Sequence, residues 1–220
     1  MEKLSPPIED YLKAIYMLRE REGAASTTGI AAVLEVTPAS VTGMIKKLAE
    51  LKLVRHAPYQ DVDLTRSGEK VALEMVRHHR LLELFLTQEL GYTWDEVHAE
   101  ADVLEHVISE EFEERMAARL GYPTVDPHGH PIPAKDGTFT AFKERALLSM
   151  RPGESEQITH INDTDSEMLR YAAGLGLKPA THLTLIEVEP FGGSLRVKIG
   201  KAEKTIGREL AAQIFVTDKA

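Results

Sequence analysis

Apolar positions in the first 120 residues recur at the three- and four-residue spacing of amphipathic helices. In the first stretch Ile8, Leu12 and Ile15 share one stripe, and Ser5 stands where a helix cap is expected. The helices predicted from this spacing cover residues 5–21, two short segments within 27–53, about 67–90 and about 94–120.

The two short helices are separated by a tight turn and followed by strand-like alternation at 53–56 and 62–65. The second of them begins at Thr37, a helix-capping residue, with Pro38 in its first turn. A helix-turn-helix with a hairpin directly after it predicts a winged helix, whose second helix enters the DNA major groove. An ordinary helical hairpin is the alternative interpretation of this pattern.

Small polar residues and then cations lie along the second helix. Small hydrogen-bonding side chains suit contact with base edges, whereas lysine and arginine suit phosphate. The residues predicted to contact DNA are Thr37, Ala39, Ser40, Thr42, Gly43, Lys46, Lys47 and the hairpin residue Arg55.

The pattern changes after a loop rich in Pro, Gly and His at 121–133. His128 and His130 of this loop could be metal ligands, but we expect them to be solvated, as loop histidines usually are. Strand-like runs follow at 155–161, 183–188, 195–199 and 214–216, with a short helix at 165–175. The predicted fold class is therefore mainly α with small β parts. The predicted domains are a winged helix over 1–66, a helical domain over 67–145 and a small β-barrel over 146–220.

Composition and charge narrow the functions that the chain can have. It contains no cysteine, which excludes disulfides, zinc–thiolate sites and thiol catalysis. Residues 67–150 hold 16 Asp and Glu against 8 Lys and Arg, whereas residues 1–66 hold 9 of each, so the front third is best suited to approach a polyanion. With neither a long apolar run nor a signal-peptide core, we expect a cytoplasmic protein without membrane contact.

Carboxylates and imidazoles gather in the acidic middle of the chain. On the helix predicted at 94–120, Asp102, Glu105 and His106 share one face, and His98 lies one turn earlier. Two carboxylates and an imidazole form a suitable ligand set for a divalent cation. A solvated acidic helix face would explain these residues equally well if they stood alone.

A second pair on the preceding helix favours metal binding. His79 and Glu83 are spaced one helical turn apart, so two His–carboxylate groups lie on consecutive helices. A di-metal carboxylate enzyme is one alternative, although such enzymes need paired Glu-x-x-His motifs that this chain lacks. A metal-independent winged-helix regulator is another.

The motifs together resemble one known family. They are the Asp10-Tyr-Leu helix, the winged helix, the segments 77–83 and 97–106, and Gly129-His-Pro-Ile-Pro. The chain resembles the diphtheria toxin repressor (DtxR/MntR) family of iron- and manganese-dependent transcriptional regulators over nearly its whole length. Its final segment is similar to that family's SH3-like (FeoA-like) domain.

The resemblance implies a homodimer that is not an enzyme and that binds double-stranded operator DNA when it holds metal. A primary metal site would fall at Asp10, Asp102, Glu105 and His106. An ancillary site would comprise His79, Glu83 and His98, completed by Asp165 and Glu167 or, less favoured, by Glu154 and Glu156.

The resemblance also bears on the choice of metal. Iron-responsive members of the family use sulfur ligands at the positions of Asp10 and Asp102. Carboxylates at both positions favour Mn(II) as the cofactor, with Fe(II) as the alternative, because hard oxygen ligands suit manganese. Manganese-responsive members often have a second carboxylate one turn after Asp10, whereas this chain has Lys13, which argues against a dinuclear site.

Overall fold

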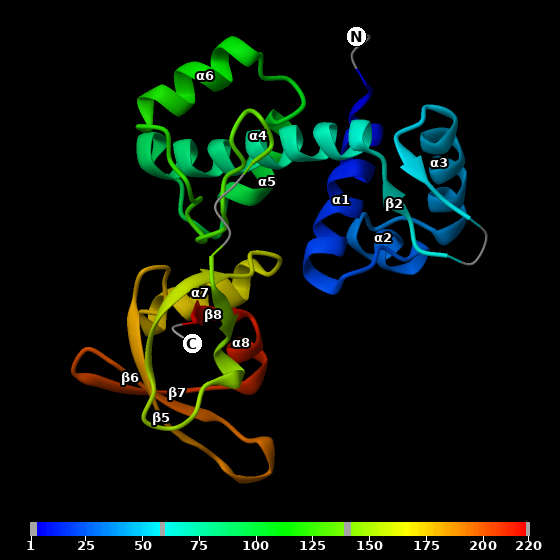
Figure 1. Cartoon of the computed structure of the whole chain (residues 1–220). Helices are drawn as coiled ribbons and strands as arrows, with labels where there is room; N and C mark the ends of the chain where they lie inside the picture. The colour runs from blue at the N-terminus through cyan, green and yellow to red at the C-terminus, as the bar shows by residue number, and fades with distance from the viewer. Residues whose placement is uncertain (1–3, 58–59, 139–141, 219–220) are drawn as a thin grey trace. The chain divides into compact units, whose positions relative to one another are not determined.

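A computed structural model describes residues 4–57, 60–138 and 142–218 (Figure 1). Helices dominate the first part of the chain and strands the last, as the sequence predicts. The helices of the first part are α1 (Pro6–Glu22), α2 (Thr27–Val33), α3 (Pro38–Glu50), α4 (Arg66–Leu90), α5 (Val97–Leu104) and α6 (Glu110–Arg119).

The helix α1 begins where the proline pair presets its first turn, directly after Ser5. It ends at Gly23, which adopts the left-handed conformation (φ 77°) that glycine reaches without steric cost. Leu12 and Ile15 are fully buried in a core shared with Ile30, Ile45 and other apolar residues of α2 and α3. This packing fixes α1 against the helix-turn-helix.

The predicted winged helix is present. The Thr37 hydroxyl accepts a hydrogen bond from the Ser40 backbone N–H and so caps α3. The strands β1 (Val54–Arg55) and β2 (Asp63–Leu64) pair antiparallel with Val54 opposite Leu64.

The single helix predicted over 94–120 is wrong: the segment forms α5 and α6 with a break between them. Ser109 causes the break, because its backbone is extended and its hydroxyl accepts a hydrogen bond from the Phe112 N–H, which starts a new helix. Glu105 and His106 consequently lie in the turn after α5 instead of on a continuous helix face.

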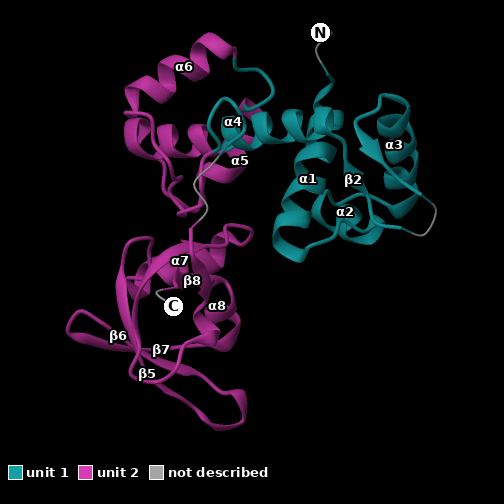
Figure 2. Ribbon diagram, viewed as in Figure 1, with its two compact units in different colours: residues 1–79, 105–108, 133–138 teal, residues 80–104, 109–132, 139–220 magenta. Residues whose placement is uncertain are grey.

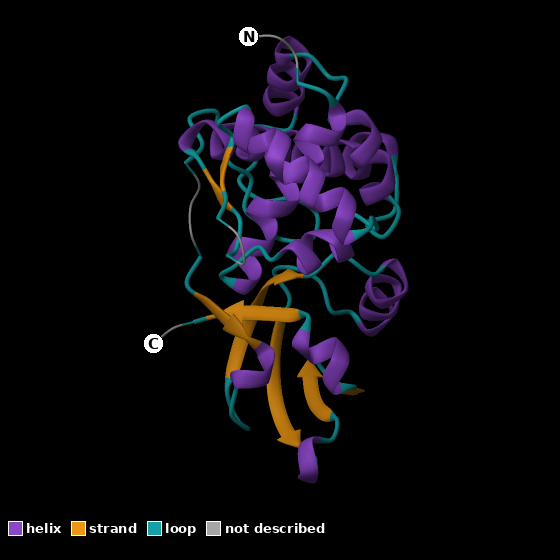
Figure 3. Cartoon of the chain, turned by 90° about the vertical axis from the view of Figure 1, so that its right-hand side faces the viewer, coloured by secondary structure: helices purple, strands orange, loops and turns teal. Residues whose placement is uncertain are grey.

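The C-terminal domain is an antiparallel sheet with two short α-helices (Figure 3). Its strand order is β3-β8-β4-β5-β6-β7, and its core includes Ile158, Leu185 and Val197. The sequence did not predict β3, β7 or α8. The elements are β3 (Glu144–Ala146), η1 (Leu147–Ser149), β4 (Ser155–Ile161), α7 (Ser166–Leu175), β5 (His182–Val188), η2 (Pro190–Gly192), β6 (Leu195–Ile199), β7 (Ala202–Ile206), α8 (Arg208–Ala212) and β8 (Ile214–Thr217).

The chain forms two compact units, which are described separately (Figure 2). Unit 1 comprises residues 1–79, 105–108 and 133–138. Unit 2 comprises residues 80–104, 109–132 and 139–220. The domain limits predicted from the sequence follow the order of the elements and stay a prediction.

Within the described ranges no single helix is long and apolar enough to cross a membrane. The helices α2 and α3 meet the length and composition criteria only when they are taken together, and they are bent by 108° at their break.

Candidate metal centres

Asp10, Glu105 and His106 lie together in unit 1, and we call them the Asp10 cluster. Asp10 comes from α1, and the other two come from the turn after α5. His106 Nε2 lies 2.9 Å from Asp10 Oδ1 and 3.9 Å from Glu105 Oε1. Two donors on one ion with bonds of about 2.1 Å are separated by roughly 3–4 Å, depending on the angle between the bonds, so this spacing suits a shared divalent cation.

Glu9, which no motif in the sequence indicated, orients the His106 ring. Its Oε2 lies 2.8 Å from His106 Nδ1. A neutral imidazole carries one N–H, so a hydrogen bond from Nδ1 to Glu9 leaves the Nε2 lone pair beside Asp10. Metal-binding histidines are commonly held by a carboxylate in this way.

The Glu105 carboxylate is almost fully buried, with 1% of its side chain exposed. Its Oε2 lies 2.6 Å from His79 Nδ1 and accepts a 2.7 Å hydrogen bond from the Lys13 ammonium. Burial favours the neutral acid, but the His79 contact and the Lys13 charge outweigh it and lower the pKa of Glu105. The buried residue is therefore an anion that is available as a ligand.

The pKa of Asp10 is shifted in the opposite direction from that of Glu105. Its partial burial, together with the nearby Glu105 carboxylate, raises the pKa of Asp10, although His106 and Lys13 act in the other direction. Repulsion between two carboxylates is the condition that a divalent cation relieves.

A second group, Asp126, His128, His130 and Asp163, lies in unit 2, and we call it the His128 cluster. Asp126 Oδ1 accepts hydrogen bonds from the backbone N–H groups of His128 and His130 and so folds the loop around itself. Asp163 follows β4, and its Oδ2 lies 3.8 Å from Nδ1 of each histidine. These separations exceed a hydrogen bond but match two ligands of one ion.

Three buried atoms of the His128 cluster make no hydrogen bond: Asp126 Oδ2, His128 Nδ1 and His130 Nδ1. Buried polar atoms without such a partner are costly, and a missing ion is one explanation. His128 Nε2 lies 2.6 Å from the Trp94 carbonyl oxygen and must donate its hydrogen there, which leaves Nδ1 facing the carboxylates. This donor set fits a divalent cation.

The charges near His128 also favour a cation in this cluster. Burial opposes its imidazolium form, but Glu83, Asp126 and Asp163 outweigh that effect and raise the pKa of His128 to about 10. The surrounding field therefore strongly favours positive charge at this position.

Glu83 and His98 adjoin this group in unit 2. His98 Nδ1 lies 3.2 Å from Glu83 Oε1, and Glu83 Oε2 lies 3.7 Å from His128 Nδ1. His98 Nε2 is 3.6 Å from Asp102 Oδ2, whose side chain is half exposed. Glu83 is the predicted ancillary residue that lies deepest, with its side chain fully buried.

Comparison with known proteins decides the family. Models of the iron-dependent repressor N-terminal DNA-binding domain, the iron-dependent repressor metal-binding and dimerisation domain, and the FeoA domain match residues 3–62, 65–134 and 145–218. The iron-dependent repressor IdeR of Mycobacterium tuberculosis is 30% identical over 228 residues, which cover 98% of this chain and 99% of IdeR. The chain belongs to the iron-dependent repressor family.

Solved structures agree. A manganese-dependent transcriptional repressor in complex with manganese is 41% identical, with a TM-score of 0.90 over 96% of this chain and 99% of that one. The IdeR of T. acidophilum is 30% identical, with a TM-score of 0.79 over 95% and 96%. The protein is thus a metal-dependent DNA-binding transcriptional repressor and not an enzyme. This removes the two alternative functions, a di-metal carboxylate enzyme and a metal-independent winged-helix regulator.

The candidate DNA-binding residues of this repressor are exposed. On α3 and its cap, the exposed residues are Thr37, Ala39, Ser40, Thr42, Gly43, Lys46 and Lys47. The Thr42 hydroxyl donates to the Pro38 carbonyl oxygen at 2.9 Å, which orients it along the helix. Arg55 is also exposed, with one long contact of 3.5 Å to the Leu64 carbonyl oxygen.

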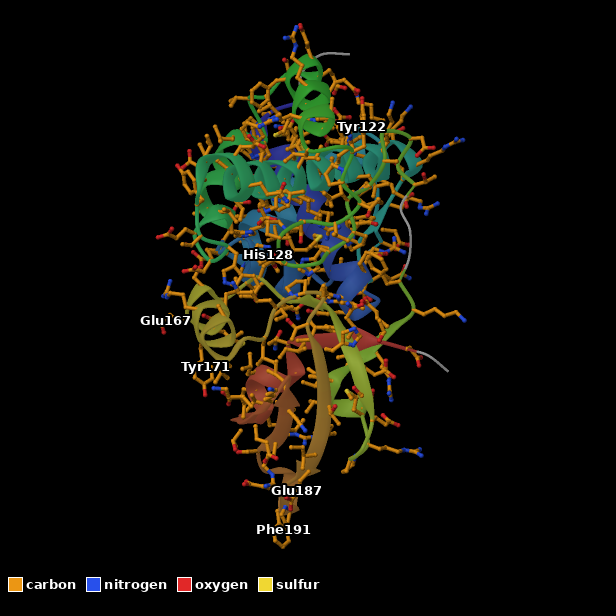
Figure 4. All side chains as sticks on the ribbon, turned by 90° about the vertical axis from the view of Figure 1, so that its left-hand side faces the viewer. Tyr122, His128, Glu167, Tyr171, Glu187 and Phe191 are labelled. Carbon is orange, nitrogen blue, oxygen red and sulfur yellow. The ribbon has the colours of Figure 1, made fainter. Side chains whose placement is uncertain are left out.

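Two predicted ancillary residues of the repressor, Asp165 and Glu167, have other surroundings in the structure. Asp165 caps α7 by accepting hydrogen bonds from the Glu167 and Met168 N–H groups, and Glu167 points into solvent (Figure 4). The residue of this segment that joins the His128 cluster is Asp163. His79 contacts Glu105 of unit 1.

The expectation that His128 and His130 are solvated is wrong. His128 has no exposed side-chain surface. Backbone pairing explains the burial, because the Ile161 N–H of β4 donates to the His128 carbonyl oxygen. The signal in the sequence was the spacing Asp126-x-His-x-His130, in which three potential ligands alternate.

Proposed function

We propose that this repressor senses Mn(II) through the Asp10 cluster, with Asp102 as a further ligand, and that it represses genes of metal homeostasis. The observation that carries the proposal is the donor set: carboxylate oxygens and an imidazole nitrogen, in a chain without cysteine. Hard oxygen donors disfavour the softer late transition ions, and Fe(II) stays the alternative ion. Similarity to a manganese-dependent repressor at 41% identity supports this choice.

The geometry of unit 1 suggests how the signal reaches DNA. Asp10 lies on α1, which packs into the same core as the DNA-binding helix α3. Glu105 and His106 lie on the turn after α5, and Glu9 holds the His106 ring in place. When bound, a divalent ion would neutralise the carboxylates and link α1 to this turn. Residues that hold α1 in one orientation would also hold α3, and metal and DNA would each tighten binding of the other.

The His128 cluster, with Glu83 and His98, is proposed as the ancillary site. Its support is the set of buried ligand atoms without hydrogen bonds and the spacing of 3.4–3.8 Å between its imidazoles and carboxylates. These residues come from α4, α5, the loop before β3 and the segment after β4. A cation there would fasten the FeoA domain to the helices of unit 2.

We propose a homodimer as the DNA-binding form. The middle third matches a metal-binding and dimerisation domain, and unit 2 exposes large apolar side chains there, including Val103, of which 67% is exposed, Leu90 and Phe112. Exposed apolar surface of this kind is typical of an interface. Two α3 helices related by a two-fold axis would suit two half-sites of double-stranded operator DNA. The proposed location is the cytoplasm, where such DNA is held.

DNA binding across buffered Mn²⁺, Fe²⁺ and Co²⁺ activities tests the metal assignment. Wild-type protein should respond to Mn²⁺, with anaerobic conditions used for iron. The double variant Asp10→Met with Asp102→Cys should shift the response toward Fe²⁺ and Co²⁺, because sulfur donors strengthen binding of softer ions. An unchanged ranking of the metals would remove the physical basis of the manganese assignment.

A further inference from the structure

Lys13 places a positive charge among ligand-type atoms of unit 1. It lies on α1, one turn after Asp10. Its Nζ lies 2.7 Å and 3.0 Å from the two Glu105 oxygens and 2.9 Å from His79 Nδ1. A carboxylate and an imidazole are the groups that bind divalent ions, and here they surround an ammonium.

The ammonium is part of the interior. Only 16% of the Lys13 side chain is exposed, and its partner Glu105 is 1% exposed. A buried carboxylate needs a cation or hydrogen-bond donors close by, since an unpaired buried charge is strongly destabilising. Lys13 meets that need from within the chain, in contact with both oxygens of Glu105.

The charge balance around the Asp10 cluster depends on this residue. Glu9, Asp10 and Glu105 are three carboxylates in contact with His106, and Lys13 offsets one of their charges. A second divalent ion held by His79 and Glu105 would have to stand where the ammonium stands, and like charges at that separation repel.

We propose that Lys13 is a built-in monocation that occupies a second cation position, between His79 and Glu105, and limits this centre to one divalent ion. The inference rests on the proposed function, in which the Asp10 cluster holds metal. It assigns Lys13 a role in setting metal stoichiometry and gives His79 the role of a latent ligand.

Metal stoichiometry tests the proposal. Mn²⁺ bound per protomer is measured by equilibrium dialysis for the wild type, Lys13→Glu and Lys13→Gln, and the Mn²⁺ electron paramagnetic resonance spectrum is recorded for each. Lys13→Glu should bind one more ion than the wild type, with spectral coupling between neighbouring ions that the wild type does not show. Lys13→Gln, which removes the charge and keeps a hydrogen-bond donor, should gain the same ion at higher Mn²⁺ concentration.

The control is Lys70→Gln, which removes an exposed positive charge from α4 and should leave the count unchanged. Circular dichroism establishes that each variant is folded, and Lys13→Gln carries the test if Lys13→Glu does not fold. An equal ion count in the wild type and in the folded Lys13 variants would overturn the proposal.

Asp10→Ala separates this result from a failure of the proposed function. It should lower the wild-type count by one ion. If it does, and the Lys13 variants change nothing, the Lys13 inference alone is wrong. If Asp10→Ala leaves the count unchanged, the Asp10 cluster itself is not the metal centre, and the Lys13 proposal falls with it.

Discussion

Two histidines of this repressor are each oriented at one ring nitrogen, which leaves the other nitrogen facing carboxylates. Glu9 holds His106 at Nδ1, and the Trp94 carbonyl oxygen holds His128 at Nε2. The sequence indicated His106, because Glu105 and His106 stand beside other ligand types at short spacing. The burial of His128 was not predictable in the same way, because it depends on backbone pairing with β4, about 30 residues later.

The raised pKa of His128 predicts a pH dependence of metal binding to the His128 cluster. With a pKa of about 10, His128 is protonated near neutral pH in the metal-free protein, and a metal must displace that proton from Nδ1. Burial opposes the imidazolium form of His130, but Asp126 and Asp163 outweigh that effect, so the pKa of His130 is also raised. Mn²⁺ affinity at this cluster should therefore rise by about tenfold or more per pH unit between pH 6 and pH 8. Isothermal titration in buffers of different ionisation enthalpy measures the proton release directly.

His128→Gln serves as the control for this prediction, because its amide can still donate to the Trp94 carbonyl oxygen while it cannot carry the proton. The affinity of that variant should be lower and its dependence on pH weaker. A wild-type affinity that is flat from pH 6 to pH 8 would contradict the assignment of His128 as a ligand.

Among the elements, the helices with clear apolar periodicity were predictable, whereas the elements set by single polar residues or by long-range pairing were not. The winged helix followed from its caps and its alternating strands. The break between α5 and α6 was missed because Ser109, one residue in an otherwise periodic stretch, starts α6. The strand β7 has mostly exposed side chains, and its place depends on pairing with β6.

The loop 126–130 packs on β4 at a position where only glycine fits. Gly129 has a φ of 94°, and a Cβ there would lie 2.0 Å from the Thr159 carbonyl oxygen. Gly129→Ala should lower the free energy of unfolding by more than the roughly 1–2 kcal/mol that a left-handed alanine costs, because the loop must also move. Urea denaturation of the metal-free protein measures the loss.

Gly153→Ala is the matched control for Gly129→Ala. Gly153 has a similar φ of 92°, but a Cβ there would meet nothing within 4 Å. It carries the conformational cost without the clash, so its loss of stability should be the smaller. Equal losses in the two variants would show that the loop does not pack on β4 as described.

At the scale of the whole chain, the acidic residues and the candidate metal ligands are concentrated in a different part of the sequence from the DNA-binding helix. The acidic excess lies in residues 67–150, which supply most of the candidate ligands, whereas charge balances over residues 1–66, which carry α3. This division, the overall fold class and the family were predictable from the sequence. The membership of the second cluster was not, because Asp126, His128 and Asp163 meet only in the folded unit.

The central claim is that the Asp10 cluster makes DNA binding depend on metal. Mn²⁺-dependent DNA binding by Asp10→Ala and His106→Ala, compared with the wild type and with Glu22→Ala, tests it most directly. Glu22 is an exposed carboxylate at the end of the same helix, which makes its variant the control for loss of charge on α1. The DNA is a fragment selected from a random pool by Mn²⁺-loaded wild-type protein, and binding is followed by fluorescence anisotropy.

Both cluster variants should stay folded by circular dichroism and lose about tenfold or more of the Mn²⁺-stimulated affinity, because each lacks one proposed ligand. Glu22→Ala should behave as the wild type. Full Mn²⁺ stimulation in both folded cluster variants would contradict the account.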